Sequence, residues 1–263
     1  VIRHRINCQE SGAVPLFVFS GVNMYTQEQL EEFRRIINSS RRAVFFGGAG
    51  VSTESGIPDF RSQDGLYNIR YAYPPEYILS ATFFRSHTEE FFSFYREKMV
   101  FPKAKPNAAH IRLAGWEREG RLAAVVTQNI DGLHQKAGSV NVFELHGSVW
   151  RNRCTKCGKC YPAEAVLESP GVPRCACGGI IKPDVVLYEE PLDPATLDGA
   201  VRCISEADTL IVGGTSLNVY PAAGLVDFFR GGKLVVINKG ETGKKLTGAL
   251  VIDSPIARFL SEV

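Results

Sequence analysis

A glycine-rich turn in this sequence combines residue types whose order can support the binding of a nucleotide. The turn follows the apolar run Ala43–Phe46, which is typical of a short buried strand, and reads Gly47-Gly48-Ala49-Gly50-Val51-Ser52-Thr53-Glu54-Ser55-Gly56-Ile57-Pro58-Asp59-Phe60-Arg61. Its glycines let the backbone turn sharply and approach a ligand closely. Ser52 and Thr53 can cap a helix whose first amides would face a phosphate, before Pro58 ends it. The turn therefore predicts the start of a dinucleotide site.

The spacing within this turn leaves a second interpretation open. Gly48-x-Gly50-x-x-Thr53 departs from the full G-x-G-x-x-G pattern, and no acidic residue follows on a second strand about 20 residues later to hold a ribose. A tight strand-to-helix turn without a ligand is the alternative.

Four cysteines are paired at a spacing that metal sites use. Cys154-x2-Cys157 and Cys175-x-Cys177 are separated by 17 residues, and the second pair is one residue shorter than in the usual zinc pattern. Four thiolates complete a tetrahedral shell, so we expect one structural zinc without an open position for catalysis. Cys160 continues the rhythm and is a spare candidate ligand. Unliganded cysteines in a loop are the alternative.

His146 is the candidate for acid–base chemistry. It ends the short apolar run 142–145 and precedes Gly147, in the region where Gln128, Asn129 and Asp131 should gather. A neutral imidazole there could act as a general base near pH 7. A purely structural histidine is the alternative.

The elements that position these residues are short apolar runs that alternate with helical segments. Strands are predicted at 43–46, 122–126, 142–145, 209–212, 234–237 and 250–252. Helices are predicted after Thr26 and within 106–119, 194–207 and 221–230. Such alternation indicates an α/β fold, a parallel sheet with helices on both faces, and open sheets of this kind bind ligands at the carboxyl ends of their strands.

A second helical region begins at Pro74-Pro75 and is rich in aromatic residues, among them Phe83, Phe84, Phe91, Phe92, Phe94 and Tyr95. We expect most of them to pack a small helical module. The alternative is that some of them line an apolar substrate groove.

Composition excludes several classes of protein. The 263 residues are 44% hydrophobic and 22% charged, which suffices for one large core, or for a main domain with a small one. A net charge of +2 gives no general attraction to nucleic acids or membranes, and no apolar run approaches the ~20 residues of a membrane span. The metal-spaced cysteines favour a reducing compartment, and we expect a cytoplasmic protein. A signal peptide within the first residues is the alternative.

Several motifs together resemble the sirtuins, the NAD-dependent protein deacylases, and the bacterial members most. The resemblance covers roughly residues 25–256 in the order of the family. It is carried by the four cysteines and by 48–52, 56–61, 127–131, 145–147 and 214–216.

The resemblance implies a domain organisation. A Rossmann-type NAD-binding domain would comprise 25–62, 106–150 and 182–263, after an N-terminal extension at 1–24. A small domain would combine a helical module at 63–105 with a zinc-ribbon module at 151–181. NAD and an acetyl-lysine protein or peptide would bind in the cleft between the two domains.

The resemblance also implies roles for single residues. His146 matches the catalytic base, which also contacts NAD. The other residues that match cofactor-binding positions are Ala49, Thr53, Phe60, Arg61, Gln128, Ile130, Asp131, Thr215, Ser216, Asn238 and Ile256.

The implied activity is NAD-dependent removal of acetyl groups from lysine side chains, with nicotinamide and O-acetyl-ADP-ribose as products. NAD would be consumed as a co-substrate. Two alternatives are a sirtuin-like protein ADP-ribosyltransferase that uses the same cleft, and a zinc-ribbon binding module with a vestigial nucleotide fold. Phe92 and Tyr95 match positions where acid-selective sirtuins carry Tyr and Arg, so we expect acetyl-lysine to be preferred over succinyl-lysine.

Overall fold

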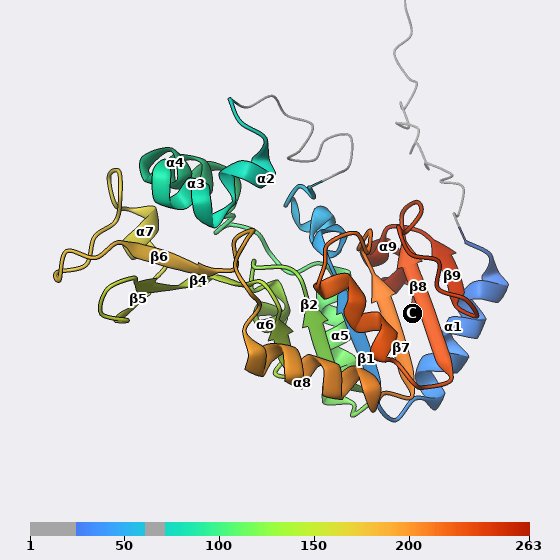
Figure 1. The fold of residues 1–263 in the computed structure, drawn as a ribbon. Coiled ribbons are helices and arrows are strands. Elements are labelled where there is room, and N and C mark those ends of the chain that lie inside the picture. The colour runs from blue at the N-terminus through green and yellow to red at the C-terminus, as the bar shows by residue number, and fades with distance from the viewer. Residues whose placement is uncertain (1–24, 61–71) are drawn as a thin grey trace, which may run out of the picture.

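A computed structural model of the chain describes residues 25–60 and 72–263. A six-stranded sheet lies beside a smaller lobe that contains a three-stranded sheet (Figure 1). The predicted N-terminal extension at 1–24 and the candidate Arg61 lie outside the described residues. Within the described part, no helix is both long enough and apolar enough to cross a membrane.

All strands of the larger sheet run parallel, in the order β3-β2-β1-β7-β8-β9. Their bounds are β1 Ala43–Gly47, β2 Leu122–Thr127, β3 Val142–Glu144, β7 Thr209–Gly213, β8 Lys233–Asn238 and β9 Leu250–Asp253. This is the strand order of Rossmann folds, in which the order reverses beside the first strand and ligands bind at that switch point. The predicted parallel sheet is confirmed, and its switch point lies between β1 and β7.

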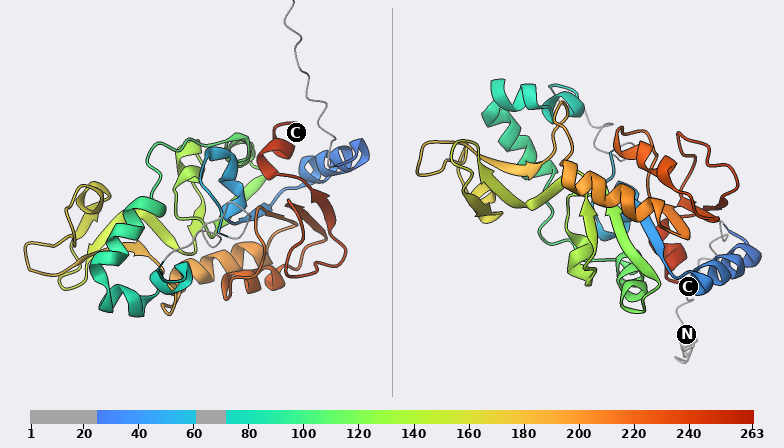
Figure 2. Two further views of the ribbon diagram at one scale, coloured as in Figure 1. Left: turned by 90° about the horizontal axis from the view of Figure 1, so that it is seen from above. Right: turned by 60° about the horizontal axis from the view of Figure 1, so that its bottom comes forward.

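Helices cover both faces of this sheet because successive side chains of each buried strand point to opposite faces. Phe45 joins the core beneath α1, α5 and α9, whereas Phe46 joins the core beneath α8 and η4. Figure 2 shows this layering from two further directions. The helices are α1 Gln27–Ser39, α5 Ala108–Arg118, α6 Leu133–Ala137, α8 Pro194–Ser205, the 3-10 helix η4 Ala222–Phe228 and α9 Ile256–Leu260.

Side-chain caps fix two of the helix starts. Thr26 forms a capping box with Gln29, as the sequence predicts, and Asn107 caps α5 through the amides of Ala109 and His110. The helix predicted within 221–230 is instead the tighter η4.

The smaller lobe joins an antiparallel sheet to a group of helices. Its sheet has the order β5-β4-β6, and one apolar cluster packs the sheet against the helices. Phe92 and Tyr95 lie in that cluster and are 0% and 1% exposed, which confirms the packing role for these two rings. The elements are α2 Pro75–Ile78, α3 Ala81–Ser86, α4 Thr88–Lys98, β4 Gly147–Cys154, β5 Cys160–Pro162, α7 Glu164–Leu167 and β6 Ile181–Val185.

Candidate active site and metal centre

The glycine turn after β1 packs directly on the segment that follows β7. The Gly50 amide donates a hydrogen bond to the Gly214 carbonyl at 2.8 Å, and the Gly48 amide donates to the Gly213 carbonyl at 3.3 Å. A Cβ on Gly50 would lie 2.9 Å from the Gly214 Cα, which is closer than real Cβ atoms come. These glycines are therefore needed for the close approach of two backbones at the switch point.

The turn does not lead into an α-helix, so this part of the sequence prediction is wrong. It forms two short 3-10 turns, η1 Ala49–Val51 and η2 Thr53–Ser55. Ser52 makes no capping bond, and its hydroxyl instead donates to Asp131 Oδ2 at 2.7 Å. Gly56, in the left-handed region at φ 81°, ends η2 just before Pro58, so the segment is too short for an α-helix.

Polar side chains after β2 form a network with Ser52. Asn129 Nδ2 donates to Ser52 Oγ at 3.1 Å, and Asp131 Oδ1 accepts from the Leu133 amide at 2.8 Å. Burial raises the pKa of Asp131, although both of its hydrogen bonds act in the opposite direction. Gln128 Nε2 donates to Thr215 Oγ1 at 3.0 Å, which ties the end of β2 to the end of β7.

His146 lies between β3 and β4, at the carboxyl edge of the sheet. Its Nδ1 is 2.9 Å from the Gln128 carbonyl, which can only accept, so this bond requires the proton on Nδ1. Nε2 is then left without a proton in the neutral ring. Burial lowers the pKa of His146, while the bond to Gln128 opposes this shift. The ring is therefore neutral at pH 7 and can accept a proton through Nε2.

One cleft of about 1230 Å³ brings the predicted residues together. Every candidate catalytic or cofactor-binding residue within the described part of the chain lines it. They are Ala49, Thr53, Phe60, Gln128, Ile130, Asp131, His146, Thr215, Ser216, Asn238 and Ile256. Of the candidates, only Arg61 lies outside the described residues.

The sequence interpretation missed other parts of this cleft. Trp150 lines it and donates from Nε1 to the Asp131 carbonyl at 2.7 Å, and the segment Val186–Glu190 forms part of its wall. The apolar wall includes Phe60, Leu79, Met99, Phe101, Ile130 and Val149. An aromatic residue four positions after His146 was the one available signal for Trp150, and Val186–Glu190 matches no motif.

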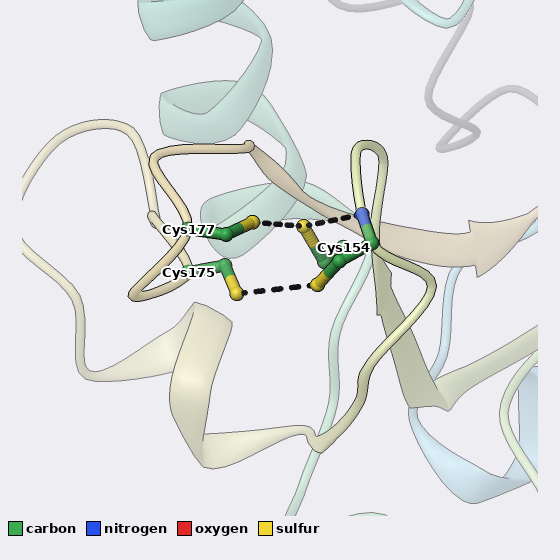
Figure 3. Close-up of side chains that lie close together, drawn as sticks. Cys154, Cys175 and Cys177 are labelled. Carbon is green, nitrogen blue, oxygen red and sulfur yellow. Dashed lines mark hydrogen bonds between the residues drawn. The ribbon is translucent and has the colours of Figure 1, made fainter.

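The four predicted cysteines converge in the smaller lobe. All four sulfur atoms lie within 4.8 Å of one another, with Cys154 to Cys177 at 3.4 Å and Cys157 to Cys175 at 3.7 Å (Figure 3). A tetrahedral zinc with Zn–S distances near 2.3 Å places its sulfurs about 3.8 Å apart. The cluster therefore fits a zinc ion held by four thiolates.

Hydrogen-bond donors surround this cluster. The amides of Lys156 and Cys157 point to Cys154 Sγ, and the Tyr161 hydroxyl donates to Cys175 Sγ at 3.0 Å. Such donors stabilise thiolates over thiols. Cys160 is exposed and lies outside the cluster, so it is not a fifth ligand. Since Cys154 and the cleft lie at opposite ends of β4, a zinc ion bound by these thiolates would have a structural role.

A Rossmann-order sheet with a glycine turn at its switch point, a neutral histidine in a cleft with polar and apolar walls, and a lobe with four clustered thiols define a nucleotide-binding α/β enzyme with a structural zinc site. The family model described as the Sir2 family matches residues 48–221. The chain belongs to this family.

Two relatives and two solved structures illustrate the match. The NAD-dependent protein deacetylases of Clostridium acetobutylicum and Clostridium perfringens are 58% and 57% identical, cover 91% and 90% of this chain, and are themselves covered over 100% and 98%. The structure "Sir2-p53 peptide-NAD+" has a TM-score of 0.78 at 42% identity, with 89% of this chain and 96% of that chain covered. "Sir2 bound to acetylated peptide" has a TM-score of 0.77 at 41% identity, with the same coverage.

Proposed function

We infer that this protein is an NAD-dependent protein-lysine deacetylase. It removes acetyl groups from lysine side chains of proteins or peptides, consumes NAD, and produces nicotinamide and O-acetyl-ADP-ribose. The observation that carries this conclusion is one cleft that joins the glycine turn, the Asp131 network and a neutral His146. Relatives named NAD-dependent protein deacetylase match nearly the whole chain, and a related Sir2 structure contains both a p53 peptide and NAD.

We propose that the NAD-binding residues form three groups around the switch point. Ala49, Thr53, Phe60 and Arg61 belong to the loop that follows β1. The nicotinamide and ribose group comprises Gln128, Ile130, Asp131 and His146. On the adenosine side we place Thr215, Ser216, Asn238 and Ile256. Except for Arg61, these residues line the same cleft, which supports the grouping.

His146 is the proposed catalytic base. Bound NAD supplies an electrophilic ribose carbon and a leaving group, and the protein supplies proton transfer and exclusion of water. The Gln128 carbonyl holds the His146 ring through Nδ1, so Nε2 carries no proton and can accept one from the reacting ribose. Burial keeps this nitrogen unprotonated near pH 7. The apolar wall with Leu79 and Met99 keeps water from the reacting atoms.

We also propose the division of the chain into a Rossmann-type domain at 25–62, 106–150 and 182–263 and a small domain at 63–105 and 151–181, after the extension at 1–24. Strands β4 and β6 cross two of these borders, since they pair from Gly147 and Val185 onward. One structural zinc belongs to the small domain. None of the six described cysteines forms a disulfide, which supports the proposed cytoplasmic location.

The proposed acyl preference is acetyl over succinyl. A carboxylate placed against the apolar wall without a cation costs several kcal/mol, whereas an acetyl group has no such cost. Lys98 and Lys239 line the cleft, and a contact from either cation to the acyl tail would weaken this preference. The ratio of kcat/KM on matched acetylated and succinylated peptides tests it, and equal values would refute it.

Release of nicotinamide tests the proposed function. We expect the purified protein to release nicotinamide from NAD only when an acetyl-lysine peptide is present. The same peptide without the acetyl group is the control. Nicotinamide release that is independent of the acetyl group, with ADP-ribose attached to protein, would instead favour the ADP-ribosyltransferase.

A further inference from the structure

The segment Val186–Glu190 connects the His146 region to the helices of the smaller lobe, and we call it the cleft segment. The Val186 amide donates to the His146 carbonyl at 3.0 Å. On the other side, the Tyr188 amide donates to the Leu79 carbonyl at 2.9 Å, and the Ala81 amide donates back to the Tyr188 carbonyl at 3.0 Å. The position of the cleft segment therefore sets the width of the cleft between His146 and α3.

An ion pair holds the segment to β6. Lys182 Nζ donates to the Val185 carbonyl at 2.9 Å and to Glu190 Oε2 at 3.0 Å. Glu190 Oε2 also accepts from the Leu187 amide at 2.8 Å. These contacts fix the shape of the segment, but they do not join it to the helices.

Glu189 makes that junction with its side chain. Its Oε2 accepts from the Thr82 amide at 2.9 Å and from the Thr82 hydroxyl at 2.7 Å, at the start of α3. Arg85 Nη2 lies 3.4 Å from the same hydroxyl and adds positive charge beside the carboxylate. Both bonds to Glu189 are charge-assisted and are stronger than neutral ones.

The backbone conformation of Glu189 indicates that this junction has a functional role. Its φ of 73° lies in the left-handed region, which glycine adopts freely and a residue with a side chain adopts at a cost. Strained residues of this kind persist where surrounding contacts hold them, and they gather at functional sites. Here the two bonds to Thr82 hold Glu189 in the wall of the cleft.

We propose that Glu189 is a positioning residue. Its two hydrogen bonds to Thr82, which we call the latch, fix the cleft segment for binding of the acylated peptide. This inference rests on the proposed function, because it assigns a role to the peptide side of the same cleft. The adenosine side is built on β7 and β8, at Thr215 and Asn238, and makes no contact of this latch. Loss of the latch therefore weakens peptide binding and leaves NAD binding intact.

Steady-state kinetics with an acetyl-lysine peptide and NAD test the latch. For Glu189→Gly we expect KM for the peptide to rise about tenfold and KM for NAD to stay within about twofold, because two charge-assisted bonds are lost. Thr82→Val should give a smaller rise, and Thr82→Ser, which keeps both donors, should restore the wild-type value. Glu76→Gln changes an exposed glutamate of α2 and is the matched control.

Two further measurements separate a latch from a merely structural residue. Glycine relieves the strained φ, which offsets the loss of the two bonds, so Glu189→Gly should melt near the wild-type temperature although its peptide KM has risen. Hydrogen exchange should show faster exchange of the Thr82 and Tyr188 amides, a result that does not depend on enzymatic activity. A lack of nicotinamide release by the wild type would refute the proposed function alone. Unchanged peptide KM and unchanged exchange in Glu189→Gly would overturn the latch.

Discussion

The two sides of the cleft are built in different ways. On the nucleotide side, the backbones of Gly50 and Gly214 touch, and no side chain fits between them. On the peptide side, side chains bridge separate elements, such as Glu189 to Thr82 and Lys182 to Glu190. Backbone contact gives a rigid site of fixed shape, whereas side-chain bridges allow one wall to change without rebuilding the sheet. The difference suggests a constant cofactor site beside an adjustable substrate site.

Removal of zinc should have the largest effect. It should unfold the smaller lobe and leave the six-stranded sheet folded. A strong chelator should unfold the three-stranded sheet and abolish activity, because four thiolates without their metal no longer hold β4 to the Cys175 loop. The six-stranded sheet should keep its protection from hydrogen exchange, since its cores are separate from that of the smaller lobe. Active protein that contains no zinc by elemental analysis would contradict this expectation.

The next largest effect should come from His146, where the two sides meet. His146→Ala should lower kcat by at least ~100-fold, the usual contribution of a general base, while NAD binding persists. Calorimetric titration with NAD checks the second part. His87→Ala, which removes a histidine from the helices of the lobe, is the control. Near-normal turnover of His146→Ala would refute the assignment of the base.

A substitution at Gly50 tests whether the nucleotide side can be disturbed without an effect on the peptide side. A methyl group there would meet the Gly214 Cα at 2.9 Å and would separate the two backbones. We expect Gly50→Ala to raise KM for NAD about tenfold or more, in line with the cost of overpacking, and to change KM for the peptide little. This is the reverse of the pattern expected for Glu189→Gly.

Gly115→Ala is the matched control for this substitution. Gly115 lies in α5, and outside the helix's own backbone the nearest atom to an added Cβ would be Arg118 Nη2 at 3.9 Å. Equal changes of both KM values in Gly50→Ala would show that the two sides are not independent.

The smallest effect concerns two buried histidines near the nucleotide side, which should make the free energy of unfolding depend on pH. His110 and His134 are buried with ring centroids 4.7 Å apart, and Asn107 next to them donates to the Val51 carbonyl. Burial lowers the pKa of His110 to about 4, and burial together with His110 lowers the pKa of His134. Between pH 6.5 and 4 the unfolded chain therefore binds protons that the folded chain does not.

The free energy of unfolding should consequently fall as the pH drops through this range, by roughly 3 kcal/mol for His110 alone. It should be insensitive to these groups above pH 6.5, where they are neutral in both states. Urea unfolding at pH 7.5 and pH 4 measures the difference. In His110→Gln the loss should be smaller, and an identical loss would show that other groups cause it.

Much of the nucleotide side could be predicted from the sequence, for a physical reason. Apolar runs that end in polar residues identify parallel strands, and the carboxyl ends of such strands meet at one edge. This logic placed His146 together with Gln128, Asn129 and Asp131, and the family resemblance added Thr215. Cysteine spacing likewise predicted the thiol cluster, because four ligands must lie within bonding distance of one ion.

The peptide side could not be predicted in this way. The hydrogen bond between Glu189 and Thr82 joins residues 107 positions apart, and no local sequence pattern predicts such a contact. No local pattern predicts the positive φ of Glu189 either. The packing of Phe92 and Tyr95 in the core of the smaller lobe was expected from the aromatic content of this region, but the sequence did not show that this core also includes the three-stranded sheet. The two 3-10 turns after Gly48 were also not predicted, because capping residues alone do not ensure room for a full helix.

The products of a single reaction test the central claim most directly. We predict that mass spectrometry of a reaction with NAD and an acetyl-lysine peptide will find nicotinamide, deacetylated peptide and O-acetyl-ADP-ribose in equal amounts. Deacetylated peptide with free acetate and unconsumed NAD would contradict the account. So would nicotinamide accompanied by a peptide that keeps its acetyl group.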